Sequence, residues 1–133
     1  MSVPLATQLA DLNRRPICIV DDDDGVTQSL KLLLEVFGFD VQSYISGAQF
    51  LADERRRTAG CLVIDLHMPG VNGLDVVDHL QREDIRLPTI LVSGRLDTSA
   101  RKRAASLGVT KVIEKPFAAR RMVDLIRASL SEL

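Results

Sequence analysis

Five short apolar segments alternate along this chain with stretches in which apolar residues recur at helical spacing. The apolar segments span residues 17–20, 39–44, 61–64, 89–92 and 109–113. Each has the length of a buried strand and is too short for a typical helix. Between the segments, apolar residues recur three and four positions apart, as they do on a helix that packs against a sheet. This repeated alternation predicts an α/β fold with a parallel sheet.

The expected helices follow from these spacings and from local start and stop signals. An apolar stripe from Val26 to Phe37 predicts a first helix that ends at Gly38. A shorter helix is expected over Ser46–Asp53, with Ser46 as its N-cap. Three later helices are expected on the apolar sets Leu74, Val77, Leu80; Ala100, Ala104, Leu107; and Met122, Leu125, Ile126, Leu130.

The polar content of the five segments indicates their order in the sheet. The first, third and fourth are almost wholly apolar, as expected of strands covered by helices on both faces. The second and fifth contain polar residues and therefore belong at the edges. The strand order 2-1-3-4-5 satisfies both conditions. It predicts a flavodoxin-like, doubly wound (βα)5 fold with a five-stranded parallel sheet.

Length and charge limit the classes of protein that this chain can represent. Its 133 residues suffice for one domain, and 17 basic against 18 acidic residues argue against direct nucleic-acid binding. The charge is uneven, because residues 93–133 contain nine basic and four acidic residues. These bases form either a basic face or ordinary solvated helix surfaces. Residues 1–15 are expected to be an N-terminal extension of a domain over residues 16–133, as a short helix or a frayed arm.

Cysteine usage and hydropathy indicate a cytoplasmic location. Cys18 and Cys61 each lie in an apolar segment and are expected to be buried, reduced thiols. No apolar run approaches 18 residues, and residues 1–15 have no basic start followed by an apolar stretch. Neither a membrane span nor a secretion signal is therefore expected.

Polar side chains follow the strands at the end where parallel sheets bind ligands. Aspartates 21–24 follow the first strand, Asp65 the third, Ser93 the fourth and Lys115 the fifth. Grouped carboxylates repel one another unless a cation binds among them, and an oxygen-only site suits Mg²⁺ or Mn²⁺ better than zinc. A carboxylate beside such a cation can attack a phosphoryl group, whose oxygens a hydroxyl and an ammonium group can neutralise. The sequence therefore predicts an aspartyl-phosphate site.

From about Arg15 to Leu130, the chain resembles the receiver domain of bacterial two-component response regulators. The resemblance rests on four motifs at the family's spacing: Ile19-Val20-Asp21-Asp22, Asp65-Leu66-His67-Met68-Pro69-Gly70-Val71-Asn72-Gly73, Ser93-Gly94 and Lys115-Pro116-Phe117. The sequence of the segment Ser46–Leu51 is similar to that found in receivers of the nitrogen-fixation and nitrate-type regulators.

The resemblance implies that Asp65 accepts a phosphoryl group in a phosphorelay. The donor would be the phosphohistidine of a sensor histidine kinase or a phosphotransfer protein, or else a small phosphodonor. Ser93 would be the hydroxyl that moves onto the phosphoryl group, and Lys115 would pair with it. Pro116 would follow a cis peptide bond. Catalysis would be limited to the chain's own phosphorylation and dephosphorylation.

The resemblance also implies the set of metal ligands. Asp22 would bind Mg²⁺ directly, Asp21 mainly through a metal-bound water, and Asp65 and the backbone carbonyl of His67 would complete the protein's share. Asp23 and Asp24 are better interpreted as helix N-terminal acids than as ligands.

A downstream protein partner, or a second copy of the chain, is expected to bind the face formed by the fourth helix, fifth strand and fifth helix. Val112 stands where receivers usually have Tyr or Phe, which puts the usual route from the phosphate to this face in doubt. The chain ends about a turn after its fifth helix, so no output domain is expected within it. A single-domain regulator and a fragment of a longer one both stay open.

The main alternative is a haloacid-dehalogenase-like phosphatase. The run Asp22-Asp23-Asp24-Gly25-Val26 approximates the Asp-x-Asp-Gly-Thr signature of that class, in which Asp22 would be the nucleophile. That fold needs an acidic pair after its fourth strand, where this chain has Ser93-Gly94. A flavodoxin-like electron carrier fits less well, because four aspartates would repel the flavin phosphate. A purely structural or binding module is the third alternative.

Overall fold

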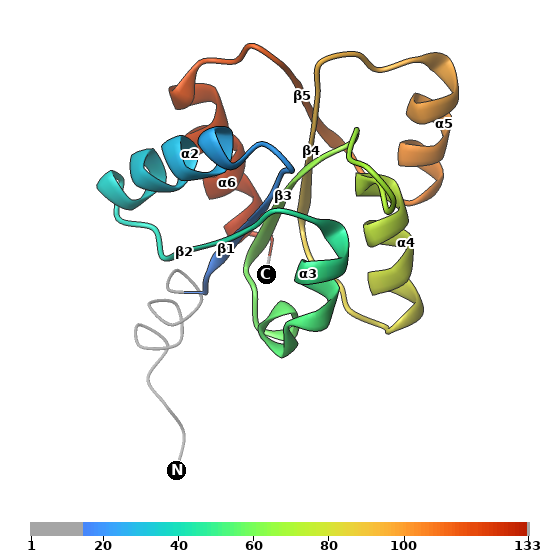
Figure 1. Ribbon diagram of the computed structural model, residues 1–133, viewed down its shortest axis with the longest axis horizontal. Helices are drawn as coiled ribbons and strands as arrows, with labels where there is room; N and C mark the ends of the chain where they lie inside the picture. Colours follow the sequence, from blue (N-terminus) through green and yellow to red (C-terminus); the bar gives the residue numbers. More distant parts are fainter. Residues whose placement is uncertain (1–14, 133) are drawn as a thin grey trace.

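One five-stranded sheet organises the computed structural model, which describes residues 15–132 (Figure 1). All neighbouring strands pair in parallel, in the order β2-β1-β3-β4-β5. The strands are β1 (Ile17–Val20), β2 (Val41–Tyr44), β3 (Cys61–Asp65), β4 (Thr89–Ser93) and β5 (Lys111–Glu114). The predicted fold class and strand order are confirmed, with β2 and β5 at the edges.

Helices cover both faces of the sheet (Figure 1). They are α2 (Asp24–Val36), α3 (Gly47–Ala52), the 3₁₀ turn η1 (Glu54–Arg57), α4 (Gly73–Arg82), α5 (Thr98–Ser106) and α6 (Ala119–Leu130). Helices α2 and α6 lie on one face, while α3, α4 and α5 lie on the other. As predicted, Ser46 caps α3, and its side chain accepts a hydrogen bond from the Gln49 amide at 3.0 Å.

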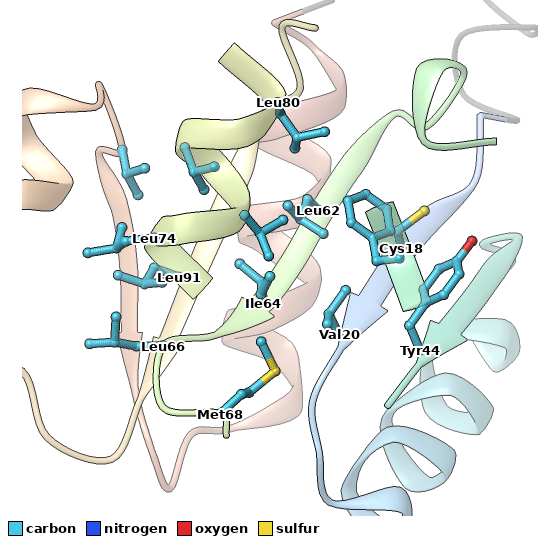
Figure 2. Packing of buried hydrophobic residues seen from close by; sticks show 14 of the residues in the cluster. Cys18, Val20, Tyr44, Leu62, Ile64, Leu66, Met68, Leu74, Leu80 and Leu91 are labelled. Atoms are coloured by element: carbon cyan, nitrogen blue, oxygen red, sulfur yellow. The ribbon is translucent and has the colours of Figure 1, made fainter. Parts of the chain in front are cut away.

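Two apolar clusters, one on each face of the sheet, form the core. Successive residues of the strands point to opposite faces, so Cys18 and Val20 enter one cluster while Ile17 and Ile19 enter the other. Figure 2 shows the first cluster, in which the β3 residue Leu62 lies close to residues of α4. Burial on both faces explains why the interior strands are so apolar.

The ends of two helices correct the predicted starts of two strands. The segments that were expected to begin at Phe39 and Val109 become strands only at Val41 and Lys111. Both apolar residues instead close a helix, because the Phe39 amide donates to Leu34 O and the Val109 amide to Ala104 O. A glycine at positive φ precedes each of them, which completes a Schellman motif. Helix α4 ends in the same way, with Asp84 at φ +59° in the glycine position.

The apolar stripe predicted for the first helix is only partly buried. Thr27, Leu30 and Leu34 are the buried residues of α2. Val26 and Phe37, which were expected on the packed face, are 37% and 40% exposed. Val26 lies in the first turn of the helix, and Phe37 is the C-cap residue that follows it. The apolar stripe therefore predicted the helix correctly but assigned too many residues to its packed face.

The two cysteines are buried and free, as predicted. Burial raises the pKa of each thiol to about 12, so both are protonated at neutral pH. Within residues 15–132, no helix is long and apolar enough to cross a membrane. The helix or arm expected within residues 1–15 lies almost wholly outside the described residues.

Candidate functional site

The predicted site residues come together at the carboxyl ends of the central strands. Asp21 directly follows β1, Asp65 is the last residue of β3, Ser93 is the last residue of β4, and Lys115 follows β5. In the register of the sheet, Asp65 stands opposite Val92, so it lies one position before Ser93 along the neighbouring strand. Chain positions up to 94 residues apart thereby reach one edge of the sheet.

Three carboxylates form an acidic cluster at this edge. Asp21, Asp22 and Asp65 each offer one oxygen, and the three oxygens lie within 4.8 Å of one another. Asp21 and Asp65 are buried, with 5% and 7% of their surface exposed, whereas Asp22 is exposed. An all-oxygen donor set, open on one side, fits a hard divalent cation that retains water ligands. The predicted metal-binding carboxylates are therefore brought together.

Lys115 bridges two of these carboxylates. Its Nζ lies 3.1 Å from Asp65 Oδ2 and 3.2 Å from Asp21 Oδ2. Partial burial by itself would lower the pKa of Lys115, but the hydrogen bond to Asp65 and the charges of both carboxylates outweigh it and raise the pKa. Lys115 is therefore a fixed positive charge beside the acidic cluster at neutral pH.

The surroundings of Asp21 raise its pKa above the usual range of an aspartate. Burial raises its pKa, and the charge of Asp65 raises it further. A hydrogen bond from the Asp23 amide at 2.9 Å and the charge of Lys115 oppose this rise without cancelling it. Asp21 therefore releases its proton less readily than an exposed aspartate does.

Asp23 and Asp24 stabilise the N-terminus of helix α2, as the sequence predicted. Asp23 is the N-cap, and its carboxylate accepts a hydrogen bond from the Val26 amide at 3.2 Å. Asp24 is the acidic residue of the first turn, where the helix dipole favours negative charge. Within the described residues, the candidate metal group contains neither of them.

Two glycines shape the segment between Asp65 and α4. Gly70 has φ +74°, a conformation that other residues rarely adopt. At Gly73, a Cβ atom would lie 2.5 Å from the backbone carbonyl oxygen of Asp65. Only glycine therefore allows α4 to begin so close to the end of β3, and the Asn72–Asp75 capping box starts the helix there.

His67 connects this segment with the loop after β4. Its backbone amide donates to Asp65 Oδ1 at 3.2 Å, while its exposed imidazole lies with Nε2 2.9 Å from the carbonyl oxygen of Arg95. From the sequence, only the backbone carbonyl of His67 was assigned a role, and the contact of its imidazole with Arg95 was not predicted. No sequence signal could have shown this contact, because any residue supplies a backbone carbonyl.

The Ser93 hydroxyl is engaged within its own loop. Ser93 is fully buried, and its Oγ donates to Arg95 O at 2.6 Å and accepts from the Arg95 amide at 3.0 Å. The Lys115 amide donates to Ser93 O at 2.9 Å, which joins the ends of β4 and β5. The Lys115-Pro116 peptide bond is cis, as the sequence analysis expected. Val112 is half-buried and packs against the core on the α4 and α5 face.

Comparisons with known proteins identify the family. The family model of the response regulator receiver domain matches residues 17–127. Transcriptional regulatory protein FixJ of Azorhizobium caulinodans is 36% identical over 115 residues, which cover 86% of this chain and 54% of that protein. Response regulator protein TodT of Pseudomonas putida is 34% identical over 129 residues, which cover 96% of this chain and 57% of that protein.

Solved structures agree with this result. The crystal structure of FixJ-N matches 90% of this chain and 95% of its own, with a TM-score of 0.81 and 32% identity. The response regulator StyR matches with a TM-score of 0.82 and 29% identity, over 90% of this chain and 60% of that one.

The chain belongs to the response regulator receiver domain family of two-component systems. The resemblance found in its four motifs is thereby confirmed. The chain spans about half the length of the curated relatives it matches. None of these findings supports the phosphatase alternative with Asp22 as the nucleophile.

Proposed function

We propose that this chain is a phospho-accepting receiver in which Asp65 takes the phosphoryl group. The donor is the phosphohistidine of a sensor histidine kinase or phosphotransfer protein, or a small phosphodonor. The observation that carries the proposal is the placement of Asp65. It is a buried carboxylate at the point where the acidic cluster and the Lys115 ammonium meet.

The acidic cluster is proposed to hold Mg²⁺, with Mn²⁺ as a substitute. Asp22 and Asp65 would ligate it directly, Asp21 mainly through a water, and the backbone carbonyl of His67 would complete the protein's share. The oxygen-only donor set supports this choice of metal. The bound cation would neutralise oxygens of the transferring phosphoryl group.

In this mechanism, a carboxylate oxygen of Asp65 attacks the phosphorus while the bond from phosphorus to the donor breaks. The leaving group keeps the electron pair of that bond. When the donor is a phosphohistidine, the leaving atom is the imidazole nitrogen. Lys115 already contacts Asp65 and is placed to pair with a phosphoryl oxygen. Ser93 can bind another phosphoryl oxygen only after its hydroxyl releases Arg95 O.

The proposed output surface is formed by α5, β5 and α6. These are the elements that the sequence analysis counted as the fourth helix, the fifth strand and the fifth helix. It would bind a downstream protein or a second copy of the chain. Exposed basic residues on α5, including Arg101 and Lys102, suit an acidic partner surface. We propose that the phosphoryl transfer takes place in the cytoplasm. The two buried free thiols support this location, because cysteines stay reduced there.

Mapping the labelled residue tests the proposal. Wild type, Asp65→Asn, Asp22→Asn and Asp24→Asn are incubated with Mg²⁺ and acetyl phosphate, and the modified residue is located by mass spectrometry. We expect the label on Asp65 in wild type and in Asp24→Asn, and none in Asp65→Asn. Asp24→Asn is the matched control, because it removes the same charge outside the cluster. A label that persists in Asp65→Asn but disappears in Asp22→Asn would overturn the proposal in favour of the phosphatase alternative.

A further inference from the structure

The segment from the end of β4 to Leu107, just after α5, packs few fully buried apolar residues and also makes polar contacts with its neighbour. Three side chains from the β3–α4 segment reach it. The imidazole Nε2 of His67 lies 2.9 Å from the carbonyl oxygen of Arg95. The guanidinium of Arg103 donates to Asp75 Oδ1 at 2.8 Å, and Nε2 of Gln81 donates to the carbonyl oxygen of Leu107 at 2.6 Å. Helix α5 itself buries one residue, Ala104.

Of these three contacts, only the one made by His67 reaches the candidate site. Arg95 O accepts two hydrogen bonds, one from Ser93 Oγ and one from the imidazole of His67. A carbonyl oxygen can only accept, so Nε2 of His67 carries the hydrogen. The same histidine donates its backbone N–H to Asp65 Oδ1. One residue therefore links the proposed phosphoacceptor to the loop that holds the Ser93 hydroxyl.

We propose that His67 is a positioning residue that latches the β4–α5 loop and thereby sets how readily Ser93 can leave it. The inference rests on the proposed function, in which Ser93 turns toward the phosphoryl group. With Arg95 O held by the imidazole, the carbonyl stays where the Ser93 hydroxyl can bond to it. Without the latch, the loop is free to move away, and the competing partner of the hydroxyl is weakened.

The effect has a defined sign. The latch stabilises the arrangement in which Ser93 faces its own loop, so its loss favours the arrangement in which Ser93 faces the site. A single net hydrogen bond near solvent corresponds to a change of about two- to ten-fold in this equilibrium. Removing the imidazole N–H is therefore expected to strengthen the binding of a phosphoryl mimic by about the same factor.

Four proteins separate the latch from a general loosening of α5. His67→Phe keeps a planar ring but has no donor, and His67→Gln restores an N–H donor on a side chain of similar reach. Arg103→Gln is the matched control, because it removes a different contact of the same segment, distant from Ser93. Wild type completes the set. All four retain the backbone carbonyl and amide of residue 67.

Two measurements are made on each protein. Amide hydrogen exchange and ¹⁵N relaxation over residues 94–97 report the loop in the free protein. Titration with beryllofluoride in the presence of Mg²⁺ reports the affinity for a phosphoryl mimic. We expect a looser loop and about two- to ten-fold tighter binding in His67→Phe, with wild-type behaviour of this loop in His67→Gln and Arg103→Gln.

Each contrary result has a distinct meaning. An unchanged loop in His67→Phe would overturn the latch. A looser loop with unchanged beryllofluoride affinity would overturn its link to Ser93. A failure of His67→Gln to restore the wild-type loop would assign the effect to the imidazole's shape and overturn the hydrogen bond as its cause. If wild type itself bound no beryllofluoride with Mg²⁺, the proposed function would fail, and the inference that rests on it would fail with it.

Discussion

The neighbouring helices α4 and α5 cover the same face of the sheet but are attached to it in different ways (Figure 1). Helix α4 buries an apolar row of Leu74, Val76, Val77 and Leu80, of which Leu74 and Leu80 are visible in Figure 2. Helix α5 fully buries Ala104 alone, with Ala100 half-buried against the same cluster, and polar side chains make further contacts with α5 and the residues that flank it. Apolar burial fixes α4 under Asp65, whereas the weaker attachment of α5 leaves the Ser93 side of the site free to change at small cost.

The largest expected effect is a loss of packing in α4. Leu80 is 2% exposed, and Leu80→Ala should destabilise the protein by about 2 to 5 kcal/mol, because it removes buried methyl groups and leaves a cavity. The matched variant Leu107→Ala removes a half-buried leucine just after α5 and should cost about 1 kcal/mol. Urea denaturation measures both. Equal losses would contradict the difference between the two helices.

The next largest effect on stability is expected from the acidic cluster of Asp21, Asp22 and Asp65. Because the pKa of Asp21 is raised in the folded state, the folded protein binds its proton more tightly than the unfolded chain does. The stability of the metal-free protein should therefore fall as the pH rises from the unfolded to the folded pKa, and the cost should persist at pH 7. Asp21→Asn should remove it and stabilise the metal-free protein by about 0.5 to 2 kcal/mol.

Thermal unfolding at several pH values, with and without Mg²⁺, tests this expectation. Mg²⁺ should raise the melting temperature of wild type more than that of Asp21→Asn, because it binds the native acidic cluster. Asp24→Asn changes the same charge outside the cluster and should respond to Mg²⁺ as wild type does. A stabilisation by Asp24→Asn as large as that by Asp21→Asn would show that net charge, and not the cluster, is responsible.

A smaller effect is expected from the ion pair that joins the two helices. Arg103 and Asp75 are 2.8 Å apart and each about 40% exposed, so solvent screening limits their contribution to about 0.2 to 1 kcal/mol. The hydrogen bond from Arg103 lowers the pKa of Asp75. Its contribution is present above the unfolded pKa and is lost as the pH falls through the folded pKa.

Arg103→Gln should therefore destabilise the protein at pH 7 and lose this difference from wild type in acid. Chemical denaturation at pH 7 and at acidic pH measures the change. Lys102→Gln is the control, since Lys102 lies on the same helix and forms no ion pair within residues 15–132. If Lys102→Gln reproduced the pH dependence, the Asp75 contact would not be its source.

A last effect of similar size concerns how the two helices end. Both end in a Schellman motif, but α4 has Asp84 at φ +59° where α5 has Gly108 at φ +76°. Glycine adopts this conformation without steric cost, so Asp84→Gly should stabilise the protein by about 0.5 kcal/mol. The reverse type of change, Gly108→Ala, should destabilise it by about 1 kcal/mol. Changes of the same sign in both variants would contradict this account.

Much of the fold and of the site followed from local patterns in the sequence. Alternating strand and helix periods, together with the difference between wholly apolar and mixed segments, were enough to predict the sheet and its order. The same order implied that Asp21, Asp65 and Lys115 meet, because parallel strands end at one edge. The starts of two strands were predicted wrongly. Phe39 and Val109 look like strand residues in sequence, yet their amides close the preceding helices.

The sequence by itself therefore determined the architecture, the acidic cluster and its lysine, since each depends on residue type and on spacing along the chain. Only the tertiary structure decided how the loops of the site are held. The contacts of His67 with Arg95 O and of Gln81 with Leu107 O join residues 28 and 26 positions apart, respectively, through backbone carbonyls. Every residue offers such a carbonyl, so only the close approach of two folded segments selects which one is used.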